Sequence, residues 1–300
     1  MLHAPLSRAQ SLLAAGGMCA VSLVFLLFIA SPVQAALGMT GLLLTELGLL
    51  ALALGGAKLL GEPLRTVFPL ARPRLRPTAG AVVLWLGIYA PVLLVAILMQ
   101  LLLPQHTAEV STGITGLIST VPLWLRFLIV AVSPAICEEA VYRGFILHHL
   151  GVLPPWARVL LCGVLFGVFH LDVTRFGSTA LLGVALSWAA VCTGNLFYPA
   201  LIHLCNNSVS VLATVALEMA AEAAPEAVAT GAEAAAAVTP ATLGVYFLLC
   251  APSPWLLWAG TALLQTDAPR RPGRAKRACL CLVLTLALLA AGFALILSQG

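Results

Sequence analysis

Apolar stretches of about 20 residues recur along most of the chain, and they constrain its fold more than any other feature. A helix of about this length crosses the roughly 30 Å of hydrocarbon in a bilayer. Of the 300 residues, 61% are hydrophobic and only 9% are charged, whereas a soluble domain has about 25% charged residues. The sequence therefore predicts an all-α fold: a polytopic transmembrane bundle of about eight to nine helices, in a multi-pass protein of the cell membrane.

Nine stretches have the length and composition of membrane spans: residues 18–37, 40–60, 80–103, 122–147, 156–171, 177–193, 196–217, 241–264 and 278–297. We treat residues 1–300 as a single membrane domain with four parts: N-terminal helices (18–110), a core (115–215), an acidic Ala-rich loop (218–240) and C-terminal helices (241–297). The acidic segment reads either as a solvated amphipathic helix or as a flexible loop. Small residues after the first stretch also resemble a signal-peptide cleavage site, but we expect this stretch to remain as a first transmembrane helix.

Basic residues gather in two connecting segments, 58–76 and 270–277, which predicts that both segments are cytoplasmic. The loop over 105–120 has no Lys or Arg and is predicted on the opposite side, together with 218–240. The formal net charge is +4, but the basic residues do not interleave with aromatic residues on one surface. We therefore expect the lipid bilayer as a partner and no nucleic acid.

Ionisable residues inside the predicted spans cost on the order of 3 kcal/mol each, so each one calls for a partner or a purpose. Three spans carry such polar sets: Glu138, Glu139 and Arg143 in the fourth, Phe166 and His170 in the fifth, and His203 and Asn207 in the seventh. Residues four apart share a helix face. Glu139 can therefore pair with Arg143, which leaves the carboxylate of Glu138 available, and His203 and Asn207 can face one cavity.

These groups make a plausible hydrolytic site. Glu138 can act as a general base while His170 orients the same water, and His203 with Asn207 can donate hydrogen bonds to a developing oxyanion. Each residue also has a purely structural interpretation, because a Glu–Arg pair or an Asn can simply join two helices, and a His can be a satisfied core residue.

At these residues the sequence resembles the CPBP family of CAAX proteases and bacteriocin-processing enzymes, also called Abi. Its three motifs, EExxxR, FxxxH and HxxxN, occur in order as Glu138-Glu139 to Arg143, Phe166 to His170, and His203 to Asn207. The resemblance covers roughly residues 115–215, the expected catalytic core. It implies an intramembrane glutamic-type protease that acts on membrane-embedded or lipid-proximal substrates. In that family the residues matching Glu138 and His170 activate water, those matching His203 and Asn207 form the oxyanion hole, and Glu139, Arg143 and Phe166 support them.

Three alternatives stay open. Two His and a Glu can hold zinc with a water in the open position, here Glu138, His170 and His203. We favour a metal-free site because the neighbouring arginine and asparagine suit water activation and an oxyanion hole. A non-catalytic immunity or scaffold protein of the same fold is the second alternative. A transporter is the third, and it is disfavoured because the sequence shows no repeated halves.

Counting along straight helices also places Glu138 nearer the inside than His170, so tilts or kinks must bring them together.

Overall fold

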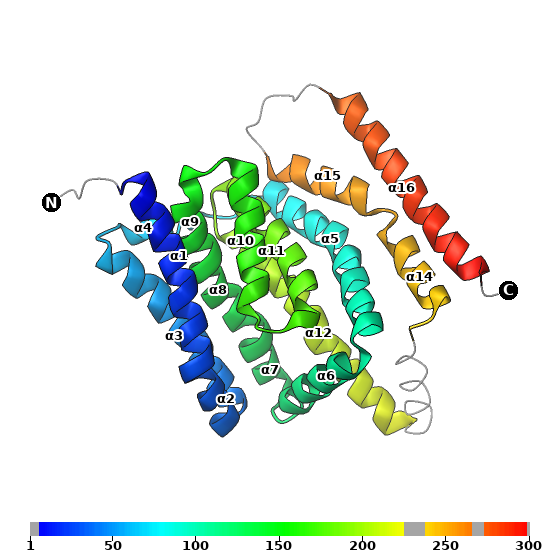
Figure 1. Cartoon of the computed structure of the whole chain (residues 1–300), viewed down its shortest axis with the longest axis horizontal. Coiled ribbons are helices and arrows are strands. Elements are labelled where there is room, and N and C mark those ends of the chain that lie inside the picture. The colour runs from blue at the N-terminus through cyan, green and yellow to red at the C-terminus, as the bar shows by residue number, and fades with distance from the viewer. Residues whose placement is uncertain (1–5, 225–237, 266–272, 299–300) are drawn as a thin grey trace.

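The computed structural model describes residues 6–224, 238–265 and 273–298, and every regular element in these residues is a helix (Figure 1). The α-helical elements are α1 (Arg8–Phe25), α2 (Ser31–Leu37), α3 (Met39–Leu59), α4 (Leu64–Val67), α5 (Leu75–Leu102), α6 (Pro104–Ile118), α7 (Leu123–Arg126), α8 (Ser133–Glu139), α9 (Leu147–His149), α10 (Pro155–Phe169), α11 (Val173–Thr193), α12 (Phe197–Ala223), α14 (Pro240–Cys250), α15 (Ser253–Leu264) and α16 (Arg274–Leu297). Three π-helical segments, η1 (Leu26–Ala30), η2 (Phe127–Val132) and η3 (Ala140–Ile146), continue neighbouring α-helices, and η4 (Leu150–Val152) is a 3₁₀ turn.

Seven helical stretches in the described residues are long and apolar enough to cross a membrane: 8–37, 39–59, 75–102, 173–193, 197–223, 240–264 and 274–297. The predicted polytopic helical bundle is therefore confirmed, and the protein is a multi-pass membrane protein. The predicted fourth and fifth spans are helical, but neither is a long continuous α-helix. The fourth alternates α- and π-helical turns from Leu123 to His149, and the fifth, α10, has only 15 residues. At 1.5 Å per residue α10 reaches about 22 Å, which is short of a full crossing.

Two predicted connections and one predicted span differ from the structure. The loop expected over 105–120 is largely the helix α6, which begins with a proline at a position that favours a helix start. The acidic segment expected as a loop from residue 218 begins as helix, because α12 continues to Ala223 through residues of high helix propensity. Residues 225–237 of that segment lie outside the described residues. The predicted span 241–264 is interrupted between α14 and α15, where Pro252 lacks the N–H that a continuous helix needs, but the stretch 240–264 as a whole is long and apolar enough to cross a membrane.

The described parts of the two basic segments lie at one end of the molecule. The connection from α4 to α5 and the start of α16 lie at the top of Figure 1, opposite α6 and the end of α12. This arrangement agrees with the topology that the positive-inside rule predicts.

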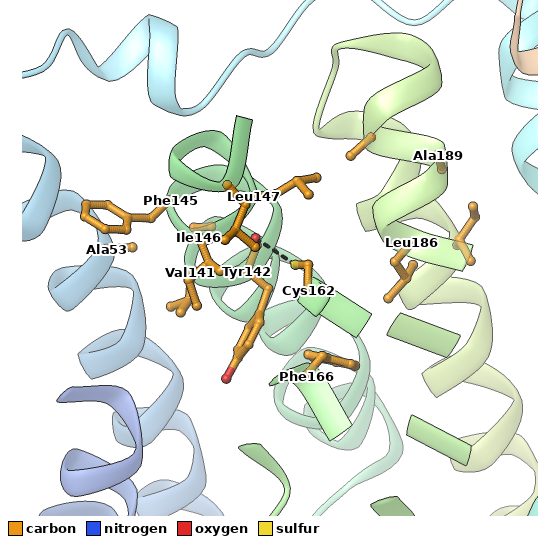
Figure 2. Close-up of a cluster of buried hydrophobic side chains, with 14 of the residues drawn as sticks. Ala53, Val141, Tyr142, Phe145, Ile146, Leu147, Cys162, Phe166, Leu186 and Ala189 are labelled. Carbon is orange, nitrogen blue, oxygen red and sulfur yellow. Dashed lines mark hydrogen bonds between the residues drawn. The ribbon is translucent and has the colours of Figure 1, made fainter. Parts of the chain in front are cut away.

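The core lies where the segment η3 packs against α10 and α11. Tyr142, Ile146 and Phe166 are almost completely buried there, and the thiol of Cys162 donates a hydrogen bond to the carbonyl of Tyr142 at 3.3 Å (Figure 2). Small residues allow close packing of α10 on α11: a Cβ atom added to Gly163 would lie 2.7 Å from the backbone nitrogen of Val184. Close backbone approach of this kind is typical of helix pairs in membranes. It holds the fifth and sixth predicted spans close together.

Candidate active site

The first motif lies on a distorted helix. Glu138 and Glu139 end α8, and Arg143 lies in the π-helical segment η3, while the preceding segment η2 is also π-helical. Pro134 follows η2 and cannot donate a backbone hydrogen bond, which favours an irregular ladder at this point. Segments of π-helix are rare and frequently occur at functional sites.

The side chains of the first and third motifs form a buried, hydrogen-bonded network. Arg143 donates to the carboxylate of Glu139 at 2.8 Å, to the carbonyl of Gly183 at 3.0 Å and to the hydroxyl of Ser187 at 3.3 Å. The same Glu139 oxygen lies 2.9 Å from Nδ1 of His203. The pairing of Glu139 with Arg143 that the sequence predicted is therefore present, and Glu139 joins it to a histidine 64 residues further along the chain.

Phe166 lies at the centre of this arrangement. The guanidinium carbon of Arg143 is 4.3 Å from the centroid of the Phe166 ring, a cation–π contact. The ring also makes edge contacts with His170 and with His203, at centroid distances of 4.9 and 5.8 Å. The second motif therefore contacts both of the others.

His170 is held at a strained turn between α10 and α11. It caps the end of α10, and Leu171 after it has a φ of 51°, in the left-handed region that leucine rarely adopts. Nδ1 of His170 lies 2.9 Å from the carbonyl oxygen of Phe166. Because a carbonyl only accepts, Nδ1 carries the hydrogen, and Nε2 of the neutral ring is left as an acceptor.

Asp172 completes this turn as the N-cap of α11. Its carboxylate accepts hydrogen bonds from the backbone N–H and the hydroxyl of Thr174, both at 2.8 Å. Burial alone would raise the pKa of Asp172, but the hydrogen bonds from Thr174 outweigh burial and lower that pKa. Asp172 is therefore an ionised cap that fixes the direction in which α11 leaves the site.

Glu138 lies beside the network without joining it. Its Oε2 atom is 3.9 Å from Nε2 of His203 and has no hydrogen-bond partner among the residues that the structure describes. The imidazole of His203 thus faces both carboxylates, Glu139 through Nδ1 and Glu138 through Nε2. Glu138 is 8% exposed, so a buried carboxyl group remains available for another partner.

Asn207 is one helical turn beyond His203 and is partly engaged by backbone. Its amide nitrogen donates to the carbonyl of Val130 at 3.0 Å, and its oxygen accepts from the amide of Asn206 at 3.2 Å. A primary amide has two N–H donors. One donor of Asn207 therefore remains for a ligand.

Glu138 and His170 are connected through two aromatic rings, although straight helices would give them different depths. Phe166 contacts both histidines, and His203 in turn faces Glu138. The irregular α8–η3 segment departs from the rise per residue that the counting assumed, because η3 is π-helical.

Two charged residues near the site were not among the sequence predictions. Glu46, on α3, is 3% exposed, its Oε2 has no hydrogen-bond partner in the described residues, and it interacts electrostatically with Glu138. Glu46 falls inside the predicted span 40–60, so the cost of an ionisable residue in a span was a sufficient signal. Arg175, near the start of α11, also interacts electrostatically with Glu138. It preceded the predicted span 177–193, so that rule did not apply to it.

Zinc would require Glu138, His170 and His203 to converge on one point with bonds of about 2 Å. Within residues 6–224, 238–265 and 273–298, no group of three His, Cys, Asp or Glu side chains has the spacing of a metal site. The side chains as placed do not fit a zinc centre, and metal dependence stays a prediction for experiment.

The comparison with known families supports the resemblance that the motifs indicated. Residues 120–209 match the family model described as type II CAAX prenyl endopeptidase Rce1-like. The resemblance to the CAAX proteases of the CPBP family is confirmed. The matched segment runs from just before α7 into α12 and contains all three motifs. It supports a CAAX-protease-type hydrolase in general terms. No curated protein and no solved structure shows a significant match to the chain.

Proposed function

We propose that the protein is an intramembrane endopeptidase that hydrolyses a peptide bond in membrane-embedded or lipid-proximal substrates. The observation that carries the proposal is the position of Glu138, a buried carboxyl group with an unpaired oxygen 3.9 Å from Nε2 of His203. A buried carboxyl group whose oxygen makes no hydrogen bond within the described residues can take up and return a proton.

In the proposed reaction Glu138 removes a proton from a water molecule as the water oxygen attacks the peptide carbonyl carbon. His170 accepts a hydrogen bond from the same water through Nε2, because its Nδ1–H is committed to the carbonyl of Phe166. The carbonyl oxygen becomes an oxyanion. Glu138 then transfers its proton to the amide nitrogen, the C–N bond breaks, and the products are an acid and an amine.

The oxyanion would accept a hydrogen bond from the remaining N–H of Asn207 and from Nε2–H of His203. The Nδ1 atom of His203 lies against the carboxylate of Glu139 and so carries a hydrogen. A second hydrogen on Nε2 makes the ring an imidazolium, and the negative charge of Glu139 compensates for it. Arg143 holds Glu139 in place. The paired network would thus position the groups that act on the oxyanion.

The test is cleavage of a farnesylated CAAX-type peptide by protein purified in detergent, with products identified by mass spectrometry. Glu138→Gln preserves the size of the side chain and removes the base, so we expect cleavage to fall by roughly 10²- to 10⁴-fold. The control is Glu109→Gln, at an exposed position on α6, which should cleave as the wild type does. Persistent cleavage by Glu138→Gln would show that the base is wrongly assigned.

Substrates in the cell can be sought by comparing the membrane proteomes of strains that carry the wild type or Glu138→Gln. Peptides that accumulate uncleaved only in the variant are the expected result. If both strains show the same proteome and the same phenotype, the non-catalytic scaffold becomes the better account.

A further inference from the structure

A polar cavity of about 480 Å³ lies between the connection from α4 to α5, the turn from α11 to α12 and the end of α15. The connection from α4 to α5 is at the top of Figure 1, the end that the positive-inside rule predicts to be cytoplasmic. The volume is within the range of about 300–1,000 Å³ that is usual for small-molecule sites. None of the motif residues lines this cavity, so the proposed protease function does not account for it.

The cavity carries positive charge without a matching negative charge. Arg72 and Arg74 line it, and none of the described residues around it is Asp or Glu. Both arginines are exposed, and neither side chain forms a hydrogen bond or an ion pair within residues 6–224, 238–265 and 273–298. A guanidinium binds a phosphate group with two parallel hydrogen bonds, so two arginines at one cavity favour a ligand that carries phosphate.

Three hydrogen bonds fix the backbone that carries the two arginines. The side-chain amide of Asn195 donates to the carbonyl of Ala71 at 3.0 Å and accepts from the N–H of Ala71 at 3.3 Å. The N–H of Arg74 donates to the hydroxyl of Tyr198 at 2.9 Å. Arg72 therefore lies between two anchored residues, and less backbone freedom is lost when a ligand binds there.

Asn195 also brings a buried donor to the cavity that it lines. The residue is 6% exposed, and its amide oxygen accepts hydrogen bonds from the N–H groups of Ala71 and Phe197. A primary amide has two N–H donors, and in the described residues only the carbonyl of Ala71 accepts one of them. The second N–H is left to donate to a ligand.

A smaller cavity of about 220 Å³ adjoins the first, because Val191, Gly194 and Asn195 line both. Arg158 lines this second cavity, and its Nε atom is buried without a hydrogen-bond partner in the part of the chain that the structure describes. A buried donor without a partner calls for an anion or an ordered water. Unpaired arginine donors therefore line both of the cavities that meet at Asn195.

We propose that Arg72, Arg74 and Asn195 bind a phosphate group in the larger cavity. Trp188 and Tyr198 also line it, and such aromatic side chains are enriched at the level of lipid headgroups. Anionic lipids give the cytoplasmic leaflet its negative surface potential, so the headgroup of an anionic phospholipid is the expected source of the phosphate. A free phosphate ion has the same recognition chemistry, and the test separates the two sources.

The test measures the Kd of the full-length protein in detergent from the rise of its thermal midpoint with ligand concentration. The probes are dioctanoyl phosphatidylglycerol, dioctanoyl phosphatidylcholine and inorganic phosphate. We expect phosphatidylglycerol to bind roughly 10-fold more tightly than phosphatidylcholine, because the arginines repel the choline cation. Inorganic phosphate should bind more weakly than phosphatidylglycerol, and if it binds as tightly, the site is kept and its ligand is the free ion.

The double variant Arg72→Gln/Arg74→Gln should raise the Kd for phosphatidylglycerol by roughly 10- to 100-fold, because it removes the charged hydrogen bonds. Arg72→Lys/Arg74→Lys should keep part of the affinity, since lysine keeps the charge and loses the bidentate geometry. The matched control is Lys58→Gln/Arg65→Gln, which removes the same charge from exposed positions in the same basic segment that do not line the cavity. The control should bind as the wild type does.

Two results would overturn the inference. The first is equal affinity of the wild type for both lipids together with no response to inorganic phosphate. The second is an Arg72→Gln/Arg74→Gln variant that binds phosphatidylglycerol no more weakly than the control variant does. An equal loss in these two variants would mean that the basic end attracts anionic lipid without a defined site, and an unchanged Kd in both would mean that the arginines do not contact the lipid.

Discussion

The site has two halves with opposite chemistry. The paired half consists of Glu139, Arg143 and His203, in which charged groups contact one another inside the bundle. The open half consists of Glu138 and His170, in which a carboxyl oxygen and a ring nitrogen proposed as an acceptor have no hydrogen-bond partner in the described residues. Both halves meet at the ring of Phe166 and the ring of His203.

This difference separates structural from chemical roles within a single set of motifs. Charges that satisfy one another stabilise the fold and hold neighbouring groups in place, whereas an unpaired polar group beside a cavity is costly unless a ligand uses it. We therefore expect substitutions in the paired half to lower stability. Substitutions in the open half should change activity with little loss of stability.

The largest effect should come from breaking the paired half at Arg143. Arg143→Met removes the cation and leaves Glu139 as an uncompensated buried carboxylate, which costs about 3–5 kcal/mol. We expect a strongly lowered thermal midpoint in detergent, measured by tryptophan fluorescence. Arg65→Met, on the exposed surface of α4, should leave the midpoint unchanged. An unchanged midpoint for Arg143→Met would mean that the network adds nothing to stability.

A smaller loss should follow from removing the ring that joins the halves. Phe166→Leu keeps an apolar side chain but removes the cation–π contact with Arg143, worth about 2 kcal/mol when desolvated. Phe169→Leu is the matched control, because Phe169 is also buried and contacts His170 but makes no cation–π contact with Arg143. The difference between the two thermal midpoints measures the cation–π term, and equal losses would contradict it.

Beside the open half, removing the charge of Glu46 should stabilise the protein. Glu46→Leu replaces a buried carboxyl group that has an unpaired oxygen and lies within electrostatic range of Glu138. Replacing such a group with an apolar side chain of similar size should raise stability by about 1 kcal/mol. Glu139→Leu, made in the paired half, should lower it. If both variants lose stability to the same extent, the distinction between the halves fails.

The sequence predicts contacts within one helix better than contacts between helices. The i,i+4 spacing was enough to predict the pair of Glu139 with Arg143, because one helix fixes that geometry locally. The link from Glu139 to His203 required the packing of α8 on α12, which no local pattern specifies. Glu46 was missed although the cost of ionisable residues in a span applied to it equally, because no second polar residue at i+4 drew attention to it.

The irregular backbone could not be predicted from composition. The π-helical segments around α8 and the positive φ of Leu171 depend on which backbone groups the neighbouring helices satisfy. These features change the path of the chain on both sides of the site, at Glu138 and at His170. The same reason explains why counting residues along ideal helices placed them apart.

The smallest expected effect concerns the strained turn beside the open half. Leu171 adopts a left-handed conformation that costs a leucine about 1–2 kcal/mol, whereas glycine adopts it freely but loses about 0.5–1 kcal/mol in backbone entropy. Its side chain is 48% exposed, so little packing is lost on substitution. Leu171→Gly should therefore raise the free energy of unfolding slightly, by about 0.5 kcal/mol, measured as a shift of the thermal midpoint.

Leu171→Val is the matched control, because a β-branched residue is strongly disfavoured at positive φ and should lower the midpoint. Peptide cleavage by Leu171→Gly then tests what the strain does. If the turn must hold His170 in a fixed position within the open half, the glycine variant will be more stable and less active, which is the signature of strain kept for function. If it is equally active, Leu171 merely ends α10, and His170 is held by its hydrogen bond to Phe166 alone.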